Sequence, residues 1–519
     1  MTSYPTNAVA WLLVIIVVSL IAACDGHSRS GDVAEEASPA LRERQCELSS
    51  SALPAGVTLK CFWWRTAVNG EFRLPVAVLS TGAAPRTALL HIAGGPGDGA
   101  QTDADNLRVW ADWLATAKPA ADLILYSPRG TRGSSGEWLC DAYERFSLET
   151  LSRSVTAAEE AAASLPILQR CFDAYAERKA KSNGLLPSQF YAAFSSRAQA
   201  ADALGLLEDL GYLRWHLWGV SYGTRVALLA AEQAQNAKRA ELQSLILDSV
   251  YPPGQGALAQ WPMLLERAWR YHEQNSPGFG NVWQRLYQRL TRVEMQLDLR
   301  LDNWNYNLDP CPSPLQHCMQ HQKHISMRLT ADRLLALSYF VLYDRSLLPS
   351  FYEGLKLLDD NLGEAAVLDN PPLILVLEAF VASTFAESFS SLVFYATECI
   401  DNGHDSAADI VAAQQQFPQW AQELELAYSS DVCALSVFAN PDVLNAQNIR
   451  LNLPLLVFAG ERDPVTPVIW ARDLAQSQPQ VTLVEASGVG HSVLSSGYCG
   501  VNAIARWIFG EKEVCRHGN

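Results

Sequence analysis

The chain has 519 residues, of which 49% are hydrophobic and 18% are charged. This balance provides enough apolar side chains for a large buried core, and it excludes a disordered chain and a protein that crosses a membrane many times. The formal net charge of −16 repels a phosphate backbone, and no basic run offsets it, so we expect no nucleic acid as a partner. The length indicates one large domain with an insertion, or two to three domains.

The beginning of the chain has the pattern of an export signal. The apolar run AVAWLLVIIVVSLIAA, residues 8–23, has the length of a signal-peptide core and is shorter than the roughly 20 residues that span a bilayer. With Cys24 it ends in Ile-Ala-Ala-Cys, which resembles the lipobox of bacterial lipoproteins. The resemblance implies a lipid on Cys24 and a membrane-anchored protein that faces the periplasm, and Asp25 resembles an inner-membrane retention signal. Because no Lys or Arg precedes the run, an uncleaved anchor and a plain cleaved signal are alternatives.

The cysteine content agrees with export. Of the 11 cysteines, ten remain when Cys24 is set aside, and an even number indicates disulfides in an oxidising compartment. Pairing in chain order would close five short loops, although the sequence alone does not establish the connectivity. The ten are Cys46, Cys61, Cys140, Cys171, Cys311, Cys318, Cys399, Cys433, Cys499 and Cys515.

Two of these cysteines allow a second interpretation. Cys311 and Cys318 lie close to His317, His321 and His324, so a metal site is conceivable there. The spacing matches no standard zinc pattern, and a disulfide-closed loop with solvated histidines accounts for the same residues. We therefore expect no metal, and no other cofactor.

The segments that follow predict an α/β architecture. Residues 25–45 are small and polar, as in a tether, and folded structure is expected from Cys46. Near-continuous apolar runs at 87–94 and 121–127 are typical of parallel strands buried on both faces, and helical patterns alternate with them. A further strand is expected at 72–80, and helices at 155–183 and 196–211. The order of strands and helices indicates a mostly parallel sheet flanked by helices.

The stretch HLWGVSYGTR, residues 216–225, places a serine between glycines. A short strand at 214–219 precedes Ser221 and a good helix at 224–235 follows it, so the serine lies at a strand-to-helix corner. A nucleophile elbow requires small residues on both sides of a sharply turned serine, and the first amide of the helix, that of Tyr222, then faces the developing oxyanion. The alternative is a glycine-flanked serine that only caps a helix.

A nucleophilic serine needs a base and a group that orients the base. Asp463 follows a predicted strand at 453–460, and His491 follows another at 481–487. Ser221, Asp463 and His491 thus occur in the chain order of an α/β-hydrolase triad, each at the carboxyl end of a strand. Alternatively, Asp463 caps a helix or joins a loop salt bridge, and Asp248 is the other candidate acid.

The loop HIAGGPGDG, residues 91–99, follows an earlier strand. Its glycines allow backbone amides to approach a substrate without obstruction by side chains. We therefore expect the amide of Gly95 to complete the oxyanion hole, with a plain turn as the alternative.

Several of these motifs together resemble one family. The GGPG loop, RGTRGS at 129–134, GVSYGT at the elbow, GERDPVTP and GVGHSV resemble the prolyl aminopeptidase and tripeptidyl aminopeptidase group of α/β-hydrolase serine peptidases, most closely its exported branch. The likeness runs from about residue 60 to the C-terminus. Two features depart from the group: Ser127-Pro128 replaces its usual Asp-Gln, and HIAGGPG replaces a common His-Gly-Gly-Pro-Gly form. Both departures concern the entrance to the site, and so the substrate.

About 200 residues between Asp248 and the strand at 453–460 exceed a bare hydrolase core. Helical patterns in this segment predict a cap, whose aromatic side chains, Tyr271 among them, are expected to form the cap's own core. Where the chain leaves the cap, the stretch ATECID contains Glu398 and Asp401. The family resemblance implies acidic residues that hold a substrate's ammonium group, and these two are the candidates; a cysteine-pinned loop with solvated carboxylates is the alternative.

The sequence therefore predicts five regions. They are a signal peptide at 1–23, a tether at 24–45, core segments at 46–252 and 441–519, and a helical cap at 253–440.

The function implied is that of an exported serine exopeptidase, which removes one to three residues from free N-termini of peptides. An exported carboxylesterase on the same triad, a non-catalytic binding lipoprotein and an interaction module centred on the cap are the alternatives.

Overall fold

The computed structural model describes residues 40–515 with gaps at 67–69, 84–85, 100, 183–184, 277, 301–323, 364–366, 368, 386–387, 403–406, 421–429, 439–443 and 445–448. The predicted signal peptide, the lipidation site Cys24 and the cysteines Cys311 and Cys318 lie outside the described residues. Within them, no helix is both long and apolar enough to cross a membrane.

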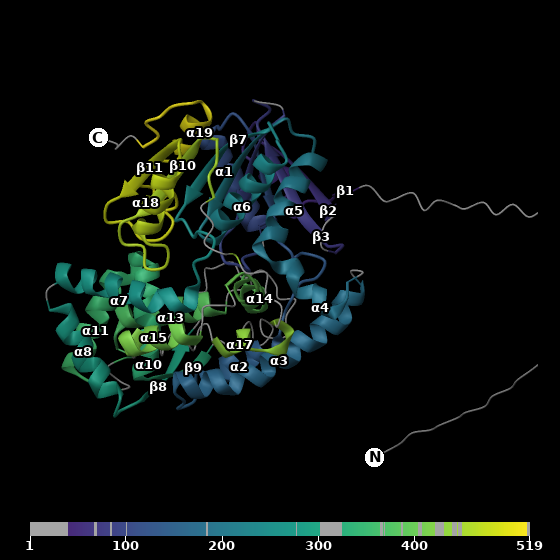
Figure 1. Ribbon diagram of the computed structural model, residues 1–519. Helices are drawn as coiled ribbons and strands as arrows, with labels where there is room; N and C mark the ends of the chain where they lie inside the picture. Colours follow the sequence, from purple (N-terminus) through teal and green to yellow (C-terminus); the bar gives the residue numbers. More distant parts are fainter. Residues whose placement is uncertain are drawn as a thin grey trace, which may run out of the picture. The chain divides into compact units, whose positions relative to one another are not determined.

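A nine-stranded sheet forms the centre of the fold (Figure 1). Its strands stand in the order β1-β2-β3-β5-β4-β6-β7-β10-β11, antiparallel from β1 to β5 and parallel from β5 to β11. The predicted α/β-hydrolase fold with a mostly parallel sheet is confirmed. The strands are β1 (Leu41–Arg44), β2 (Thr58–Arg65), β3 (Arg73–Ser80), β4 (Thr87–Ile92), β5 (Asp122–Tyr126), β6 (Arg214–Val220), β7 (Leu242–Asp248), β10 (Leu455–Gly460) and β11 (Val481–Ala486).

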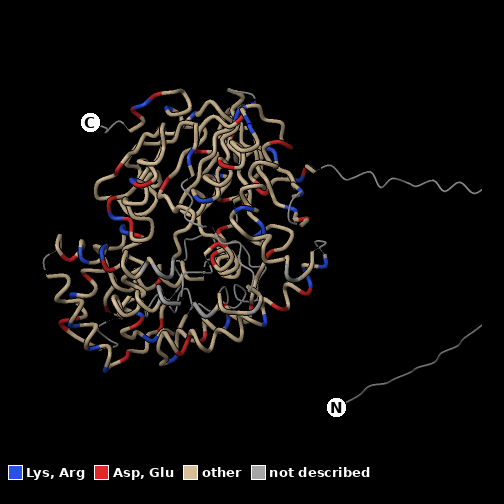
Figure 2. The backbone as a smooth tube through the Cα atoms, viewed as in Figure 1, with Lys and Arg blue, Asp and Glu red and all other residues tan. Residues whose placement is uncertain are grey.

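The central strands are apolar on both faces because helices cover both sides of the sheet. Alternate residues point to opposite faces, so Leu217 packs with α6 (Tyr222–Asn236) and its neighbour Trp218 packs with α1 (Ala104–Ala117). Helices α5 (Ser196–Asp209) and α18 (Val468–Ser477) join the first layer, and α19 (Ala503–Ile508) joins the second. Charged residues lie mostly on the outer helices and loops (Figure 2).

The cap consists of two segments of chain rather than one. The predicted segment after β7 forms helices and a short hairpin, and it packs against α3 (Ala157–Ser182), which the sequence analysis placed beside the sheet. Asp332 accepts a hydrogen bond from the amide of Ala157 at 2.9 Å, and Arg333 donates to the carbonyl of Thr150 at 2.6 Å. Helix periodicity alone does not specify which layer a helix joins, which is why α3 was misplaced.

The other elements of the cap complete this unit. Before α5 they are α2 (Asp141–Thr150) and α4 (Pro187–Phe190); after β7 they are α7 (Ala257–Asn275), α8 (Phe279–Leu290), β8 (Met295–Arg300), β9 (His324–Leu329), α10 (Ala331–Tyr343), α11 (Leu348–Asp360), α13 (Pro371–Thr384), α14 (Ser391–Asn402), α15 (Ala407–Gln416) and α17 (Ser430–Cys433).

Strand β1 lies inside the range that was predicted to be a tether. It pairs antiparallel with β2, so the fold begins ahead of Cys46. The polar sequence of β1 hid it, because an edge strand carries few apolar residues.

Four disulfides follow chain order and confirm that part of the predicted pairing. They join Cys46 to Cys61, Cys140 to Cys171, Cys399 to Cys433, and Cys499 to Cys515. Such a set is typical of a protein that folds outside the reducing cytosol, in the periplasm or beyond the cell.

Candidate active site

Ser221 lies at the corner between β6 and α6, with φ 54° and ψ −122°. A non-glycine residue in this region is strained, and such strain is typical of a nucleophile elbow. The flanking glycines are required by space: a Cβ on Gly219 would lie 2.4 Å from the carbonyl oxygen of Gly223, and one on Gly223 would lie 2.1 Å from that of Ile92. The sequence pattern therefore corresponds to a sharply turned serine rather than to an ordinary helix cap.

His491 and Asp463 form a close pair at the carboxyl edge of the sheet. The imidazole Nδ1 lies 2.7 Å from Asp463 Oδ2. The other carboxylate oxygen accepts from the amides of Val465 and Thr466 at 2.9 and 2.8 Å, and the Thr466 hydroxyl donates to Oδ2 at 2.6 Å. Asp463 is thus fixed in place and holds the imidazole with Nδ1 protonated, which leaves Nε2 as the basic nitrogen.

The Nε2 atom of His491 is buried, and it has no hydrogen-bond partner within the part of the chain that the structure describes. Buried polar atoms are nearly always paired, so an unpaired imidazole nitrogen requires an explanation. A base that awaits the proton of a nucleophile or a substrate provides one.

Asp248 joins the serine and histidine loops instead of acting as the triad acid. Its carbonyl oxygen accepts from the amide of Ser221 at 2.8 Å. Its carboxylate accepts from the amides of Val493 and Leu494 at 2.8 and 2.9 Å. The end of β7 therefore brings the elbow and the histidine loop to the same place, and the alternative in which Asp248 orients His491 Nδ1 is wrong.

The pKa of His491 is raised. Burial alone would lower it, but the charge and hydrogen bond of Asp463, with a smaller contribution from Asp248, stabilise the imidazolium more strongly. Burial would raise the pKa of Asp463, but the charge and hydrogen bond of His491, together with hydrogen bonds from the hydroxyl and amide of Thr466, lower it. The acid stays ionised while the imidazole takes up a proton, as a catalytic pair requires.

The glycine loop after β4 lies against the serine. A Cβ on Gly94 would lie 3.4 Å from Ser221 Cβ and 3.9 Å from Ser221 Oγ. Gly95 adopts φ +108°, a conformation that favours glycine. Ser390, just before α14, holds the loop by donating its amide to the carbonyl of Gly97 at 2.9 Å, and Gly99 donates to Ser388 at 2.7 Å. The cap thereby fixes the loop that faces the nucleophile.

The two departures from the family pattern have structural roles. Ser127 is buried and accepts a hydrogen bond from the amide of Gln101 at 3.2 Å, so it ties the glycine loop to the end of β5. His91 packs between Trp110 and Trp218, with ring centroids 4.6 and 5.0 Å away, and burial lowers its pKa to about 3. His91 is therefore a neutral core residue and no rival to His491.

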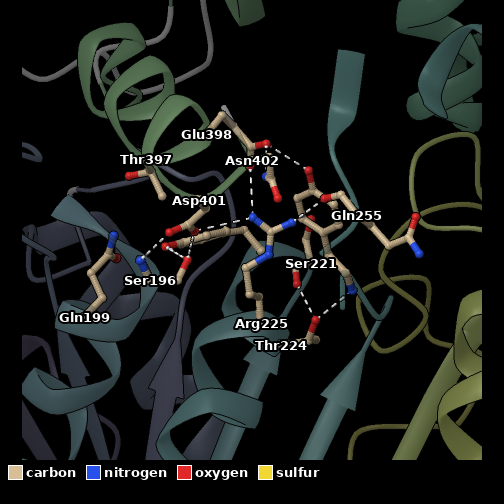
Figure 3. A network of polar contacts seen from close by, with 12 residues as sticks. Ser196, Gln199, Ser221, Thr224, Arg225, Gln255, Thr397, Glu398, Asp401 and Asn402 are labelled. Carbon is tan, nitrogen blue, oxygen red and sulfur yellow. Dashed lines mark hydrogen bonds and ion pairs between the residues drawn. The ribbon is translucent and has the colours of Figure 1, made fainter. Parts of the chain in front are cut away.

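Figure 3 shows that Glu398 and Asp401 of α14 face Arg225 of α6. Nη1 of Arg225 lies 3.4 Å from Glu398 and 3.5 Å from Asp401, and its Cζ lies 3.9 Å from the centre of the Tyr251 ring. The network continues to other side chains: Glu398 accepts from the Tyr251 hydroxyl at 3.0 Å and from Asn402 at 2.8 Å, and Asp401 accepts from the amide of Ser196 at 3.1 Å and from its hydroxyl.

This network changes the interpretation of the acidic pair. Asp401 is fully buried and Glu398 is 8% exposed, and both neutralise a guanidinium from the helix that begins at the nucleophile. Asp401 is therefore no ligand for an incoming amine, and neither acid is a solvated loop carboxylate. No sequence signal indicates this role of Arg225, because an arginine in an amphipathic helix is ordinarily solvated.

Cap residues approach the histidine directly. Tyr343, at the end of α10, places its ring centroid 4.9 Å from that of His491, and its side chain is 45% exposed. The cap therefore forms part of the wall around the base, as a cover that selects substrates requires.

One hollow of the molecule lies apart from this site. It has a volume of about 830 Å³ and is lined by Thr87, Arg214 and Val481, which begin β4, β6 and β11 and so mark the opposite edge of the sheet. Among the described residues, no group of His, Cys, Asp and Glu side chains converges as metal ligands would.

The order of strands and helices agrees with the comparison against known families. A family model described as alpha/beta hydrolase fold matches residues 87–498. No curated protein sequence matches the chain.

Solved structures that align with the chain have diverse activities. Because their sequence identities and TM-scores are low, they provide no evidence about its substrate. They include a proline iminopeptidase from Mycobacterium smegmatis (13% identity, 88% of this chain and 99% of that chain, TM-score 0.35), a thermophilic esterase from Thermogutta terrifontis (14%, 87% and 97%, 0.33) and a haloalkane dehalogenase variant from Bradyrhizobium elkanii (14%, 88% and 98%, 0.34). The family match spans most of the chain, and on that basis the chain belongs to the alpha/beta hydrolase fold family and is a hydrolase of that fold.

Proposed function

We propose that the protein is a serine hydrolase that forms an acyl-enzyme on Ser221. The observation that carries the proposal is the fixed His491–Asp463 pair, whose Nδ1 is bonded at 2.7 Å while the buried Nε2 has no partner among the described residues. This arrangement leaves one basic nitrogen at the carboxyl edge of the sheet, on a loop that Asp248 ties to the strained serine.

The chemistry follows from these positions. His491 Nε2 takes the proton of Ser221 Oγ, which attacks the substrate carbonyl, and the amides of Tyr222 and Gly95 stabilise the oxyanion. The bond between the carbonyl carbon and the leaving group breaks, and the leaving group takes the proton from His491. A water molecule then gives a proton to His491 and attacks the acyl group, after which Ser221 recovers its proton and the acid product departs.

For the substrate, we propose peptides with free N-termini, from which one to three residues are released. Two features support this choice. The chain shares motifs with the aminopeptidase group, and the ring of the cap residue Tyr343 lies against the imidazole of His491. Arg225 already pairs with Glu398 and Asp401, and Asp401 is fully buried, so this acidic pair does not by itself account for recognition of a substrate amine. Carboxylic esters are the second candidate, since the same triad cleaves them.

The location belongs to the same proposal. A lipid on Cys24 would anchor the enzyme to the membrane on the periplasmic side, and the four disulfides support exposure to an oxidising compartment.

Active-site labelling and substrate panels test the function. We expect a neutral fluorophosphonate to label the wild-type protein and to fail with Ser221→Ala, which should remain folded. Peptides with free N-termini should be cleaved faster than N-blocked peptides and short acyl esters. Faster cleavage of the esters would favour the carboxylesterase, and unchanged turnover in Ser221→Ala would refute the mechanism and favour a binding lipoprotein or an interaction module.

A further inference from the structure

Two arginines meet beside the catalytic histidine. Arg345 follows α10 in the cap, and a Cβ on Gly490 would lie 2.9 Å from its Cδ, so its side chain rests on the residue before His491. Arg462 immediately precedes Asp463. Its Nη2 donates to the Tyr271 hydroxyl at 3.1 Å, and its Cζ lies 4.6 Å from the centre of that ring. Cap and core therefore each contribute one guanidinium to this corner of the site.

Neither guanidinium forms an ion pair with a carboxylate among the described residues. The adjacent acids are engaged elsewhere: Asp344 accepts from Ser346, and Asp463 holds His491. Glu461 feels the charge of Arg462, but it accepts from the amide of Gly488 and the hydroxyl of Ser487, each at 2.9 Å.

The surroundings make this pair unfavourable in the absence of a ligand. Burial and the charge of Arg462 lower the pKa of Arg345, which shows that the two cations repel each other. Burial and both arginines lower the pKa of the neighbouring His272 to about 4, so that this ring is neutral near pH 7. Arg462 Nε and His272 Nε2 are buried and have no hydrogen-bond partner among the residues that the structure describes. An unpaired buried donor destabilises a protein, and an anion would accept a hydrogen bond from Arg462 Nε.

We infer that Arg345 and Arg462 form an anion subsite of the active site, and that the preferred substrate carries a carboxylate within their reach. The inference rests on the proposed serine hydrolase function and specifies its substrate class. A guanidinium matches a carboxylate with two parallel hydrogen bonds, and one that lacks an internal partner keeps its donors for a ligand. In a peptide the carboxylate is the C-terminus or an acidic side chain; in an ester it belongs to a dicarboxylic acid.

Two matched substrate pairs locate the carboxylate. The first pair is 4-nitrophenyl monosuccinate and 4-nitrophenyl butyrate, which differ by a charge on the acyl side. The second is one short peptide with a free N-terminus, made as the C-terminal acid and as the amide, which differ on the leaving-group side. We expect kcat/KM to favour the carboxylate member of at least one pair by on the order of tenfold or more, mainly through KM.

Charge removal assigns the preference to the arginines. Arg345→Gln and Arg462→Gln should abolish the preference, and Arg345→Lys should restore part of it. Arg270→Gln is the matched control, because Arg270 lies on α7 beside Tyr271 but is 69% exposed in its side chain and pairs with Glu266. A preference that survives both glutamine variants, or its absence in the wild-type protein, would overturn the subsite.

Labelling of Ser221 separates this inference from the proposed function. A neutral fluorophosphonate should be slowed by succinate but not by succinamide, and Arg345→Gln should remove the difference. Labelling that is equally insensitive to both compounds overturns the subsite while the serine hydrolase stands. Absence of any labelling overturns the hydrolase and the subsite with it. The glutamine variants are shown to be folded by circular dichroism and by their own labelling with fluorophosphonate.

Discussion

At the scale of single residues, the site depends on which groups hold a charge and which groups hold a position. Asp463 does both for His491, since it stays ionised and fixes the proton on Nδ1. Asp248 positions the loop that carries His491 without bonding the ring. Arg225 is a buried cation whose acids are supplied by the cap.

The pH profile of Asp463→Asn tests the first of these roles. His491 must be neutral to accept a proton, so activity falls as the pH drops through its raised pKa. Without the negative charge that pKa falls, so we expect the acid limb of kcat/KM to move to lower pH. We also expect kcat to fall by roughly 10⁴-fold, because the correct tautomer is lost. Asp473→Asn, on the exposed face of α18, is the control. An unmoved acid limb would argue against the assignment.

Gly223 in the elbow allows a test of close backbone packing rather than of charge. A Cβ on Gly223 would lie 2.1 Å from the carbonyl oxygen of Ile92. Because this oxygen belongs to the backbone, no change of side-chain rotamer relieves the clash. We expect Gly223→Ala to destabilise the fold by about 1–3 kcal/mol and to abolish turnover, as measured by urea unfolding and ester hydrolysis. Gly363→Ala is the matched substitution, since no described atom lies within 4 Å of a Cβ added there. Equal stability of the two variants would contradict the packing argument.

At the scale of elements, α14 connects the cap to the catalytic machinery. Residues just before its first turn hold the glycine loop, Glu398 and Asp401 near its C-terminal end pair with Arg225 on α6, and Cys399 joins it to α17. Because α6 begins directly after the nucleophile, one cap helix supports both the elbow and the loop that faces it.

Removal of the cation tests this link. We expect Arg225→Met to destabilise the protein by about 3–5 kcal/mol, because two buried carboxylates lose their counter-ion. Adding Glu398→Gln and Asp401→Asn should recover much of that loss. Arg472→Met breaks an exposed pair with Glu485 and should change the free energy of unfolding by about 1 kcal/mol or less. A small effect of Arg225→Met on the free energy of unfolding in urea would mean that Arg225 is not the main counter-ion of Glu398 and Asp401.

At the scale of the whole molecule, cross-links are distributed over the sheet edge, both segments of the cap and the C-terminal region. Each disulfide restricts the unfolded chain and so raises stability. The pair Cys399–Cys433 closes the longest of these loops, with a separation of 34 residues, and lies on the helix that supports the site.

Its removal should therefore affect both folding and function. We expect the double variant Cys399→Ser/Cys433→Ser to lose about 2–4 kcal/mol of stability and to show reduced hydrolysis. The corresponding variant of Cys499 and Cys515, which are 16 residues apart near the C-terminus, should lose stability with less effect on activity. Thermal melts and ester hydrolysis measure both. Identical activity losses in the two variants would contradict the role given to α14.

The sequence by itself predicted the elbow, the chain order of Ser221, Asp463 and His491, and the strands β3, β4, β5, β6, β10 and β11. These depend on local signals: apolar runs, glycines at a corner and polar residues after strands. Pairing of eight cysteines in chain order was likewise predicted, and the structure contains those four disulfides.

Only the tertiary structure decided what distant residues do to each other. It assigned α3 to the cap, paired β1 with β2, gave Glu398 and Asp401 to Arg225, and brought Arg345 beside Arg462. The physical reason is that charge and burial are properties of a neighbourhood. The sequence pattern around a carboxylate is the same whether the carboxylate binds a substrate or neutralises a buried arginine. Only the packing of α14 on α6 distinguishes the two.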